Sequence, residues 1–178
     1  MPICRNRCPV KTAKGSLCKN FVKSGKAGCV FHHRLVDDLI YEETKNYEDG
    51  TIREKYMVKN HLREGKCERW YSNGEKWIES NYKEGVLHGE YKEWYSNGNP
   101  FVVCNYKDEQ VDGLHQTWDI DGTLYEAIFE NGKVMNGKLL DWWCVGKKCC
   151  EYTFVEGEMK GTQKYWDIDG TQYDEYIR

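Results

Sequence analysis

The chain has 178 residues, of which 39% are hydrophobic, 14% aromatic and 31% charged, and its mean hydropathy is -0.84. This length suits one ordinary domain or a repeat array with a small appendage, and the low apolar content argues against a thick globular core. No stretch approaches the roughly 18 consecutive apolar residues that a membrane-spanning helix needs. The net charge of -3 hides an asymmetry, because residues 1–36 hold eight of the 26 basic residues and none of the 29 acidic ones, leaving 18 − 29 = −11 for the rest. A basic head on an acidic body predicts separate partners for the two parts.

The nine cysteines are interpreted as reduced thiols. Their number is odd, and the N-terminal sequence Met-Pro-Ile-Cys-Arg-Asn-Arg has no apolar signal segment. Both features predict a reducing compartment, the cytoplasm of a cell.

Residues 1–34 are expected to form a small zinc-binding module. Their apolar residues are too few and scattered to build a core, so metal binding would have to supply the order. Three thiolates and one imidazole, the ligand set of a closed structural Zn2+ site, are offered by Cys8, Cys18, Cys29 and His32. Cys4 is an alternative to Cys8, and His33 is an alternative to His32. A closed site leaves no coordination position for water, so we expect one structural zinc ion and no catalysis by it.

The spacing of these ligands is Cys-x9-Cys-x10-Cys-x2-His, with Thr-x-x-Gly between the first two cysteines and Cys-Lys-Asn at the second. This pattern resembles a small zinc-binding motif that recurs in proteins of large DNA viruses, and the match covers residues 8–32. The resemblance implies a metal site in which Cys8 is the first ligand. It implies no particular partner.

The same module carries a basic patch. Its members are Arg5, Arg7, Lys11, Lys14, Lys19, Lys23, Lys26 and Arg34. Clustered Lys and Arg side chains neutralise phosphates without reading a base sequence, which makes nucleic acid a candidate partner. The competing interpretation is a solvated surface that keeps the module soluble, and it is supported by the scarcity of aromatic side chains for base stacking, which are only Phe21 and Phe31.

Residues 35–46 are predicted to form a short amphipathic helix. Leu35, Val36, Leu39 and Ile40 recur at i, i+1, i+4 and i+5, the spacing of one helical face. A helix this short is marginal alone. We therefore expect it to lie on the first repeat as a cap with a polar outer side.

Residues 47–178 are predicted to be a repeat array with a period of 24. The tryptophans recur at Trp70, Trp94, Trp118, Trp142 and Trp166, and glycines follow them at Gly74, Gly98, Gly122, Gly146 and Gly170. A fixed period in this range indicates a stack of identical units. Asn-Gly or Asp-Gly precedes the return run in most units and predicts a tight hairpin turn, whereas Val145-Gly146 predicts a different one.

Superposing the units predicts which positions share a face. One column holds Tyr56, Ser80, Cys104, Ile128, Tyr152 and Tyr176, and a second holds Val58, Tyr82, Tyr106 and Phe154, with Phe129 one residue early. A third column, Trp77, Phe101, Tyr125, Cys149 and Tyr173, has the opposite parity, so either a bulge brings it inward or it decorates the second face. Cys67 and Cys144 fall on repeat columns and are expected to be small core fillers. Adjacent Cys149 and Cys150 are expected to point to opposite faces.

These blocks, Tyr-x-x-Gly-x-x-x-Gly and Trp-Tyr-x-Asn-Gly, resemble MORN-type repeats from about Tyr47 to the C-terminus. The resemblance implies a mainly β fold, an elongated, single-sheeted antiparallel meander of about 11 strands. Arrays of this kind with the zinc motif attached resemble proteins of amoeba-infecting large viruses of the marseillevirus kind. The resemblance therefore implies a structural or virion-associated component, located in the host cytoplasm or in the particle.

The sequence favours a non-enzymatic scaffold that binds protein partners, among them viral structural proteins. No nucleophile, base and orienting group recur together at any position, and aromatic columns suit protein interfaces. Nucleic acid binding through the basic head is the alternative function. Membrane attachment is disfavoured, because an array at −11 is repelled by anionic lipid. Residues 173–178 are expected to leave an open sheet edge where a partner chain or a second copy docks.

Overall fold

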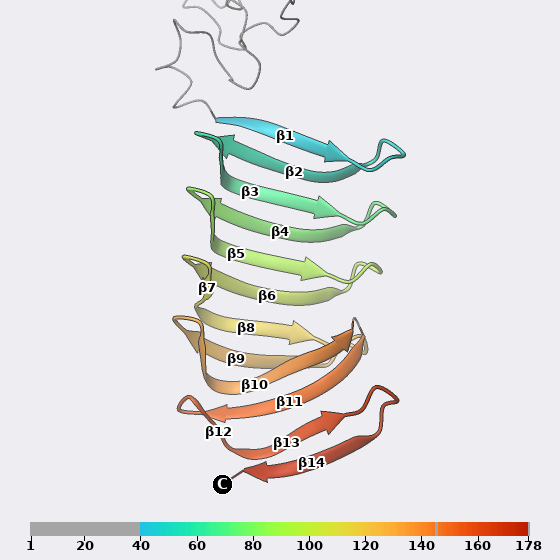
Figure 1. Cartoon of the computed structure of the whole chain (residues 1–178), viewed down its shortest axis with the longest axis vertical. Helices are drawn as coiled ribbons and strands as arrows, with labels where there is room; N and C mark the ends of the chain where they lie inside the picture. The colour runs from blue at the N-terminus through green and yellow to red at the C-terminus, as the bar shows by residue number, and fades with distance from the viewer. Residues whose placement is uncertain (1–39, 145, 178) are drawn as a thin grey trace, which may run out of the picture.

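The computed structural model describes residues 40–144 and 146–177, which fold into one antiparallel sheet of 14 strands (Figure 1). The strands are β1 (Ile40–Asn46), β2 (Ile52–Lys59), β3 (Leu62–Trp70), β4 (Lys76–Lys83), β5 (Val86–Trp94), β6 (Pro100–Lys107), β7 (Gln110–Val111), β8 (Gly113–Trp118), β9 (Leu124–Glu130), β10 (Lys133–Cys144), β11 (Lys147–Val155), β12 (Glu158–Met159), β13 (Gly161–Trp166) and β14 (Gln172–Ile177). Twelve strands follow one another in chain order, while β7 and β12 pair with β6 and β11 beside that path. Of these twelve strands, 12 − 1 = 11 lie after residue 46, which agrees with the predicted number of about 11. The predicted antiparallel meander is therefore confirmed.

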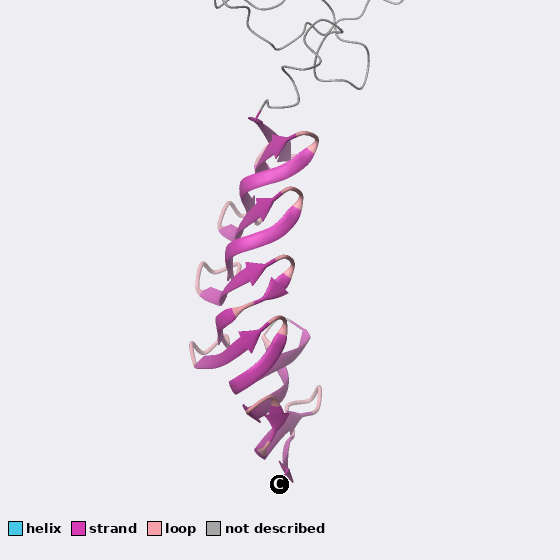
Figure 2. Ribbon diagram, turned by 90° about the vertical axis from the view of Figure 1, so that its left-hand side faces the viewer, coloured by secondary structure: helices cyan, strands magenta, loops and turns pink. Residues whose placement is uncertain are grey.

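The sheet is a single layer. Figure 2 shows the strands stacked in a narrow, twisted ribbon. Within residues 40–144 and 146–177 there is no helix, and no second sheet covers either face. Burial therefore comes from neighbours on the same face, as at Cys67, which is 1% exposed and lies with Tyr56 and Val58 among the flanking rings of Tyr41 and Tyr82.

Residues 40–46 form β1, so the helix predicted over 35–46 is wrong for this part, and residues 35–39 lie outside the described residues. Subtracting one period of 24 from Leu62–Trp70 places a strand at 38–46, a range that contains β1 (Ile40–Asn46). The β1 backbone pairs with β2 from Ile40↔Lys59 to Asn46↔Ile52. This ladder satisfies backbone groups along the whole strand and outweighs a local helical pattern of four apolar residues.

Each hairpin tip is a short turn in which glycine supplies the positive φ. At the second tip, Tyr71 N–H donates to Glu75 O at 2.9 Å, Gly74 N–H donates to Tyr71 O at 3.0 Å, and Gly74 has φ +87°. This is a three-residue hairpin turn with a glycine bulge, so the predicted hairpins are confirmed. Asn73 Oδ1 accepts the Glu75 N–H at 3.1 Å, which explains why Asn or Asp precedes the glycine. The five repeat-defining glycines, Gly74, Gly98, Gly122, Gly146 and Gly170, have φ between +83° and +92°.

A β-bulge follows four of the tips and decides the third column. In each case one residue of the return strand is left unpaired, namely Arg53, Trp77, Phe101 and Cys149. The bulge turns Trp77 toward the face of Glu93, whose Oε1 accepts the indole N–H at 3.1 Å. The sequence left two alternatives for the column of Trp77, either a bulge that brings it inward or a place on the second face. At Trp77 the structure shows the bulge, which places the side chain on the face of Glu93.

The fourth and sixth hairpins lack this bulge, and in the sixth Tyr165↔Tyr173 and Trp166↔Gln172 are consecutive pairs. The fourth hairpin shows the consequence. Thr117↔Tyr125 and Trp118↔Leu124 are consecutive pairs, so Tyr125 enters the regular ladder. The return strand is one residue shorter than in the hairpins with a bulge, so Ile128 lies on the face opposite to that of Tyr56. Ala127, 1% exposed, takes the position on the Tyr56 face that was predicted for Ile128. The prediction that Ile128 shares the face of Tyr56 is wrong for this reason, and the early position of Phe129 has the same cause.

Candidate functional site

Side-chain donors at the tips connect each repeat to the next. The Tyr71 hydroxyl donates to the backbone carbonyl of Trp94, 23 residues further on, at 2.8 Å. The same bond runs from Tyr47 to Trp70, from Tyr95 to Trp118 and, through an indole N–H, from Trp143 to Trp166. The side chains of Trp70, Trp94, Trp118, Trp142 and Trp166 are themselves partly exposed. The tryptophan column is thus a row of hydrogen-bond acceptors through its backbone as much as a row of packed rings.

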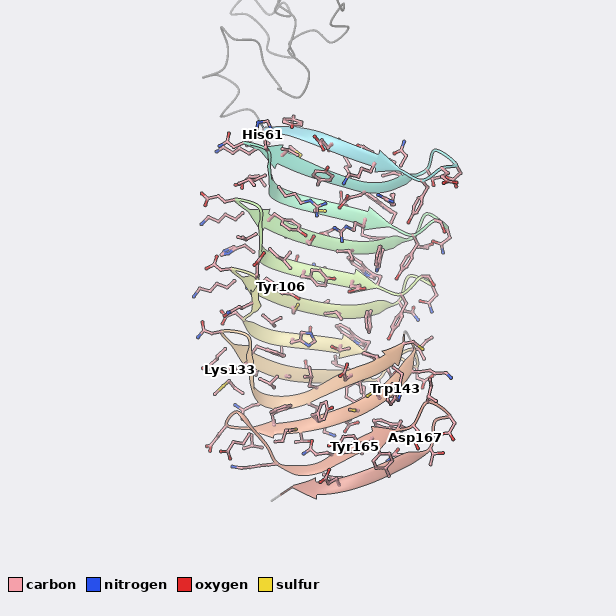
Figure 3. All side chains as sticks on the ribbon, viewed as in Figure 1. His61, Tyr106, Lys133, Trp143, Tyr165 and Asp167 are labelled. Carbon is pink, nitrogen blue, oxygen red and sulfur yellow. The ribbon has the colours of Figure 1, made fainter. Side chains whose placement is uncertain are left out.

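One face of the sheet, the aromatic face, carries rings in almost every repeat. Its ring-bearing members are Tyr56, Tyr82, Tyr91, Tyr106, His115, Phe129, Tyr152, Phe154, Tyr165 and Tyr173. Tyr91 and Tyr106 meet edge to face at 5.5 Å between centroids, and Tyr165 stacks on Tyr173 at 5.4 Å. Figure 3 shows Tyr106 and Tyr165 over the strands, with Trp143 and Asp167 on the side of the tips and His61 and Lys133 on the side of the connections. Most of these rings are only partly buried, so they form an open surface.

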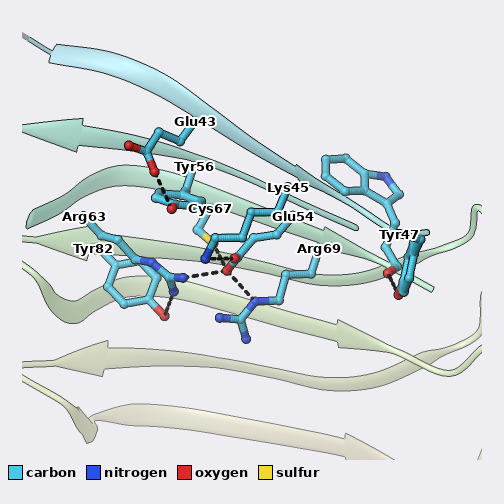
Figure 4. A network of polar contacts seen from close by, with 10 residues as sticks. Glu43, Lys45, Tyr47, Glu54, Tyr56, Arg63, Cys67, Arg69 and Tyr82 are labelled. Atoms are coloured by element: carbon cyan, nitrogen blue, oxygen red, sulfur yellow. Dashed lines mark hydrogen bonds and ion pairs between the residues drawn. The ribbon is translucent and has the colours of Figure 1, made fainter. Parts of the chain in front are cut away.

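A buried carboxylate lies at the N-terminal end of this face. The Glu54 side chain is only 7% exposed and binds three cations: Arg63 at 2.7 Å, Arg69 at 2.9 Å and Lys45 at 3.2 Å (Figure 4). The guanidinium of Arg63 also lies over the Tyr56 ring at 4.7 Å. Beside the cluster is an open pocket of about 280 Å3, lined by Glu54, Arg63 and Arg69 together with the bulge residues Arg53 and Trp77.

The surroundings of Glu54 hold it in the ionised form. Burial alone would raise the pKa of this carboxyl, but hydrogen bonds from Arg69 and Lys45 and the charge of Arg63 outweigh burial and lower it. This cluster is not among the sites predicted from the sequence. The signal available was the pairing of one acid in β2 with two arginines in β3, and it could be read only once the register Glu54↔Arg69 was known.

The opposite face, the ion-pair face, is a mosaic of Lys and Glu. Lys66 and Lys76 share Glu68 and Glu79 at 2.7 to 3.1 Å. Three periods, or 72 residues, further along, Glu151 repeats the position of Glu79 and accepts Lys138 at 2.8 Å and Lys164 at 3.4 Å. The partly exposed pairs of Glu68 and Glu79 contribute little stability each, whereas Glu151 is buried beneath its two lysines. These ion pairs keep this face hydrated and distinguish it from the aromatic one.

At the fourth tip, Asp119 replaces the tyrosine of the connecting ladder. Its carboxylate, 1% exposed, accepts Lys148 Nζ at 2.7 Å and two backbone N–H groups of its own turn, those of Asp121 and Thr123. Burial would raise the pKa of Asp119, and these partners lower it on balance. Lys148 Nζ also lies 3.2 Å from the Tyr125 hydroxyl, so an ion pair fastens the fifth repeat to the fourth.

The environments of the cysteines in the array agree with the prediction at Cys67 and differ from it at Cys144 and at Cys149. Cys67 is a buried core filler, as expected, but Cys144 is exposed at a tip. The bulge at Cys149 places its thiol 2.9 Å from that of Cys150, so the prediction that the two point to opposite faces is wrong. This contact, followed by burial, raises the pKa of Cys149 to about 11. No trio of His, Cys, Asp or Glu that could hold a metal occurs among the described residues.

Thr117 Oγ1 and His115 Nδ1 lie 3.3 Å apart, which places a hydroxyl beside an imidazole base. The Thr117 residue is 3% exposed, and burial lowers the pKa of His115. No third side chain holds the imidazole among the hydrogen bonds of the described residues. This pair therefore lacks the orienting group and the access to substrate that nucleophilic catalysis needs.

The predicted zinc site and the basic patch lie outside the described residues. They comprise the ligands Cys8, Cys18, Cys29 and His32, the alternatives Cys4 and His33, and the basic residues from Arg5 to Arg34. Residues 40–144 and 146–177 contain only strands and turns, so no helix among them is long and apolar enough to cross a bilayer.

Two stretches of the chain, residues 63–84 and 87–108, match the family described as MORN repeat variant. They run from β3 into β4 and from β5 into β6, so each match covers one hairpin. None of the curated proteins compared with the chain matches it. Proteins with MORN repeats generally use them for interactions with proteins or membranes.

Proposed function

We propose that this chain is a non-enzymatic protein-interaction scaffold, in which the aromatic face of the MORN-type ribbon receives a protein partner. The observation that carries the proposal is the row of partly exposed rings on a single-layer sheet, with nothing packed over them in the described part of the chain. Tyrosine and tryptophan give large contact areas at a small entropic cost. By the resemblance of the head and the array to proteins of large DNA viruses, the partner is a structural component in the host cytoplasm or in a virus particle.

The test is recovery of partners from the native source with the full chain as bait, identified by mass spectrometry. Tyr106→Ala removes one ring from the middle of the aromatic face, and Asn105→Ala, on the exposed neighbouring residue, is its control. We expect the first variant to lose tenfold or more of the partner, about 1.4 kcal/mol, and the second to lose none. Equal melting temperatures establish that both variants are folded. Equal recovery by both folded variants contradicts the proposal.

The N-terminal residues 1–34 supply the second part of the proposed scaffold, a head that holds one structural Zn2+ through Cys8, Cys18, Cys29 and His32. The chemistry of three thiolates and one imidazole supports this assignment. Nucleic acid is the alternative partner, supported by eight basic residues and no acidic ones in residues 1–36. Salt separates the two functions, because phosphate binding weakens steeply between about 50 and 200 mM salt and an aromatic interface does not.

The outer edge of β14 is a second proposed docking place for a partner chain. Among the strands of residues 40–144 and 146–177, β14 pairs only with β13, so its other edge offers them no hydrogen bonds and presents N–H and C=O groups for pairing. Deleting residues 173–178 is expected to abolish an association that uses this edge and to leave the zinc content unchanged.

A further inference from the structure

Each tip begins with the residue that occupies the position of Tyr71, the donor of the bond to the next repeat. The polarity of the residue that follows this position changes halfway along the array. In the first three tips it is polar, and in the last three it is apolar or a thiol: Glu48, Ser72, Ser96, Ile120, Cys144 and Ile168. Cys144 is predicted to be a small core filler, yet it is exposed, and in the same column Ile120 is 51% exposed and Ile168 is 65% exposed. Exposed apolar residues that gather at one end of a ribbon indicate an interaction surface.

These residues form one continuous surface, which we name the tip ridge: Ile120, Trp143, Cys144 and Ile168. The Ile120 side chain reaches the fifth turn, where its Cδ1 lies 3.4 Å from the position of a Cβ built on Gly146. Lys147 Nζ donates to Ile168 O at 3.2 Å and ties the fifth turn to the sixth. Trp143 is 53% exposed, and its indole N–H is held by Trp166 O at 2.7 Å. A hollow of about 220 Å3 opens between these two turns, lined in part by Trp166, Lys148 and Ile168.

The rim of the tip ridge is acidic. Asp121, Asp167 and Asp169 are exposed in the same turns, and Lys147 is the exposed cation beside them, which gives −3 + 1 = −2. A partner that fits must place apolar side chains on the ridge and positive charges around it. An anionic lipid surface meets the first requirement and fails the second.

The chain contains a segment with this character. Residues 1–36 carry eight basic residues and no acidic ones, and Leu35, Val36 and Leu39 follow as an apolar group. Leu35 is five residues from Ile40 of β1, a reach of at most about 18 Å, whereas β13 lies ten strand steps from β1, about 48 Å. The apolar group of one copy therefore cannot reach Ile168 of the same copy.

We propose that the tip ridge of one copy binds the basic N-terminal segment, residues 1–39, of a second copy, so that copies associate head to tail. The two surfaces differ, so the contact is heterologous and leaves a free segment at one end of the pair and a free ridge at the other. The association therefore continues into longer chains as concentration rises. It is independent of the aromatic face, which remains available for the partner of the proposed function.

The test uses two complementary full-length variants and measures mass by analytical ultracentrifugation. The ridge variant is Ile120→Ser with Ile168→Ser, which installs the residue that Ser72 and Ser96 already place in this position. The segment variant is Lys14→Glu, Lys23→Glu and Lys26→Glu, which reverses charge without touching the predicted zinc ligands. Ser72→Ala is the matched control at a polar tip. Wild type and the control should increase in mass with concentration, and each variant alone should remain a monomer.

The decisive measurement is the mixture of the two variants. The segment variant keeps an intact ridge and the ridge variant keeps an intact segment, so one productive contact forms and the mass doubles and stops there. A monomeric wild type at about 200 µM overturns the proposal, since even a weak contact with a Kd near 100 µM is populated there. Chains that persist in either variant alone also overturn it and point to the β14 edge. A mixture that stays monomeric overturns it as well, because the pairing of ridge with segment is then absent.

Discussion

The hydroxyl of Tyr95 donates a 2.7 Å hydrogen bond to the backbone carbonyl of Trp118, which belongs to the next hairpin. Tyr95 is itself 4% exposed, so its hydroxyl makes this bond from a buried position. With the equivalent bonds of Tyr47 and Tyr71, it makes a ladder along the tips that runs beside the backbone ladder of the sheet. The stacking of repeats is therefore fastened at one side, where the sequence is most regular.

Removing this hydroxyl should loosen the junction of two repeats without disturbing either hairpin. We expect Tyr95→Phe to lower the free energy of unfolding by about 1 kcal/mol, because the Trp118 carbonyl loses its partner. Hydrogen exchange should rise first at the third and fourth tips, since a repeat contacts only its neighbours. Tyr173→Phe, at an exposed hydroxyl with no such bond, is the control. Equal effects of the two changes would contradict a special role for the ladder.

The Gly137 backbone approaches β9 too closely for any side chain. A Cβ there would lie 2.3 Å from Glu126 O and 2.7 Å from Ala127 Cα, and Gly137 has φ +109°. Gly161 shares the repeat position with φ +77° but has open space around it. We expect Gly161→Ala to cost about 1 kcal/mol from backbone strain and Gly137→Ala to cost clearly more, measured by urea unfolding. If the two variants are equally stable, the close approach is not a constraint.

Acid should weaken the N-terminal end of the array through Glu54. Its folded pKa is lowered from an ordinary 4.5, so its stabilisation is fully present above about pH 4.5 and is lost as pH falls through the folded value. Glu54→Gln should cost about 3 kcal/mol, the lower end of the range for breaking a buried ion pair, because Arg63 and Arg69 stay partly exposed. The variant should also lose part of the dependence of stability on pH below about 4.5. An unchanged pH profile would show that Glu54 is not the group that titrates.

Elemental analysis should find about one zinc ion per chain. Cys18→Ser is expected to reduce this content sharply, and Cys67→Ser, which changes a thiol within the sheet, is expected to leave it unchanged. Full zinc content after the first substitution would remove Cys18 from the ligand set. Separate Cys4→Ser and Cys8→Ser variants decide between those two ligands.

The regular part of the fold could be predicted because the same turn and strand residues recur in each 24-residue unit. The glycine after Asn or Asp requires a positive φ, and two glycine columns in each 24-residue unit predict two turns joined by two short strands. The same reasoning failed at Ile40 to Asn46, where a local apolar spacing was given more weight than the phase of the repeat. Subtracting one period from β3 would have identified β1.

The sites were less predictable, because they depend on register. The Glu54 cluster arises from residues that face one another across β2 and β3, and their pairing is set by bulges that no single residue type announces. Likewise the meeting of the Cys149 and Cys150 thiols follows from the bulge at Cys149. The register signal in the sequence was Phe129, one residue out of its column, which marked the fourth hairpin as one without a bulge.

That hairpin also limits how repeats can be exchanged. From Lys107 to Glu130, the residues that precede two successive connections, the chain advances 23 residues, one fewer than the period. From Lys133 to Trp142 it then takes one residue more than from Val86 to Trp94. The deletion and the insertion fall between Trp118 and Trp142, whose spacing stays at 24. A recombination event that joins units at their tryptophans inherits both changes and stays in phase. A crossover between Tyr125 and Lys133, after the deletion and before the insertion, takes only one of them and moves the side chains of the following strands to the opposite face.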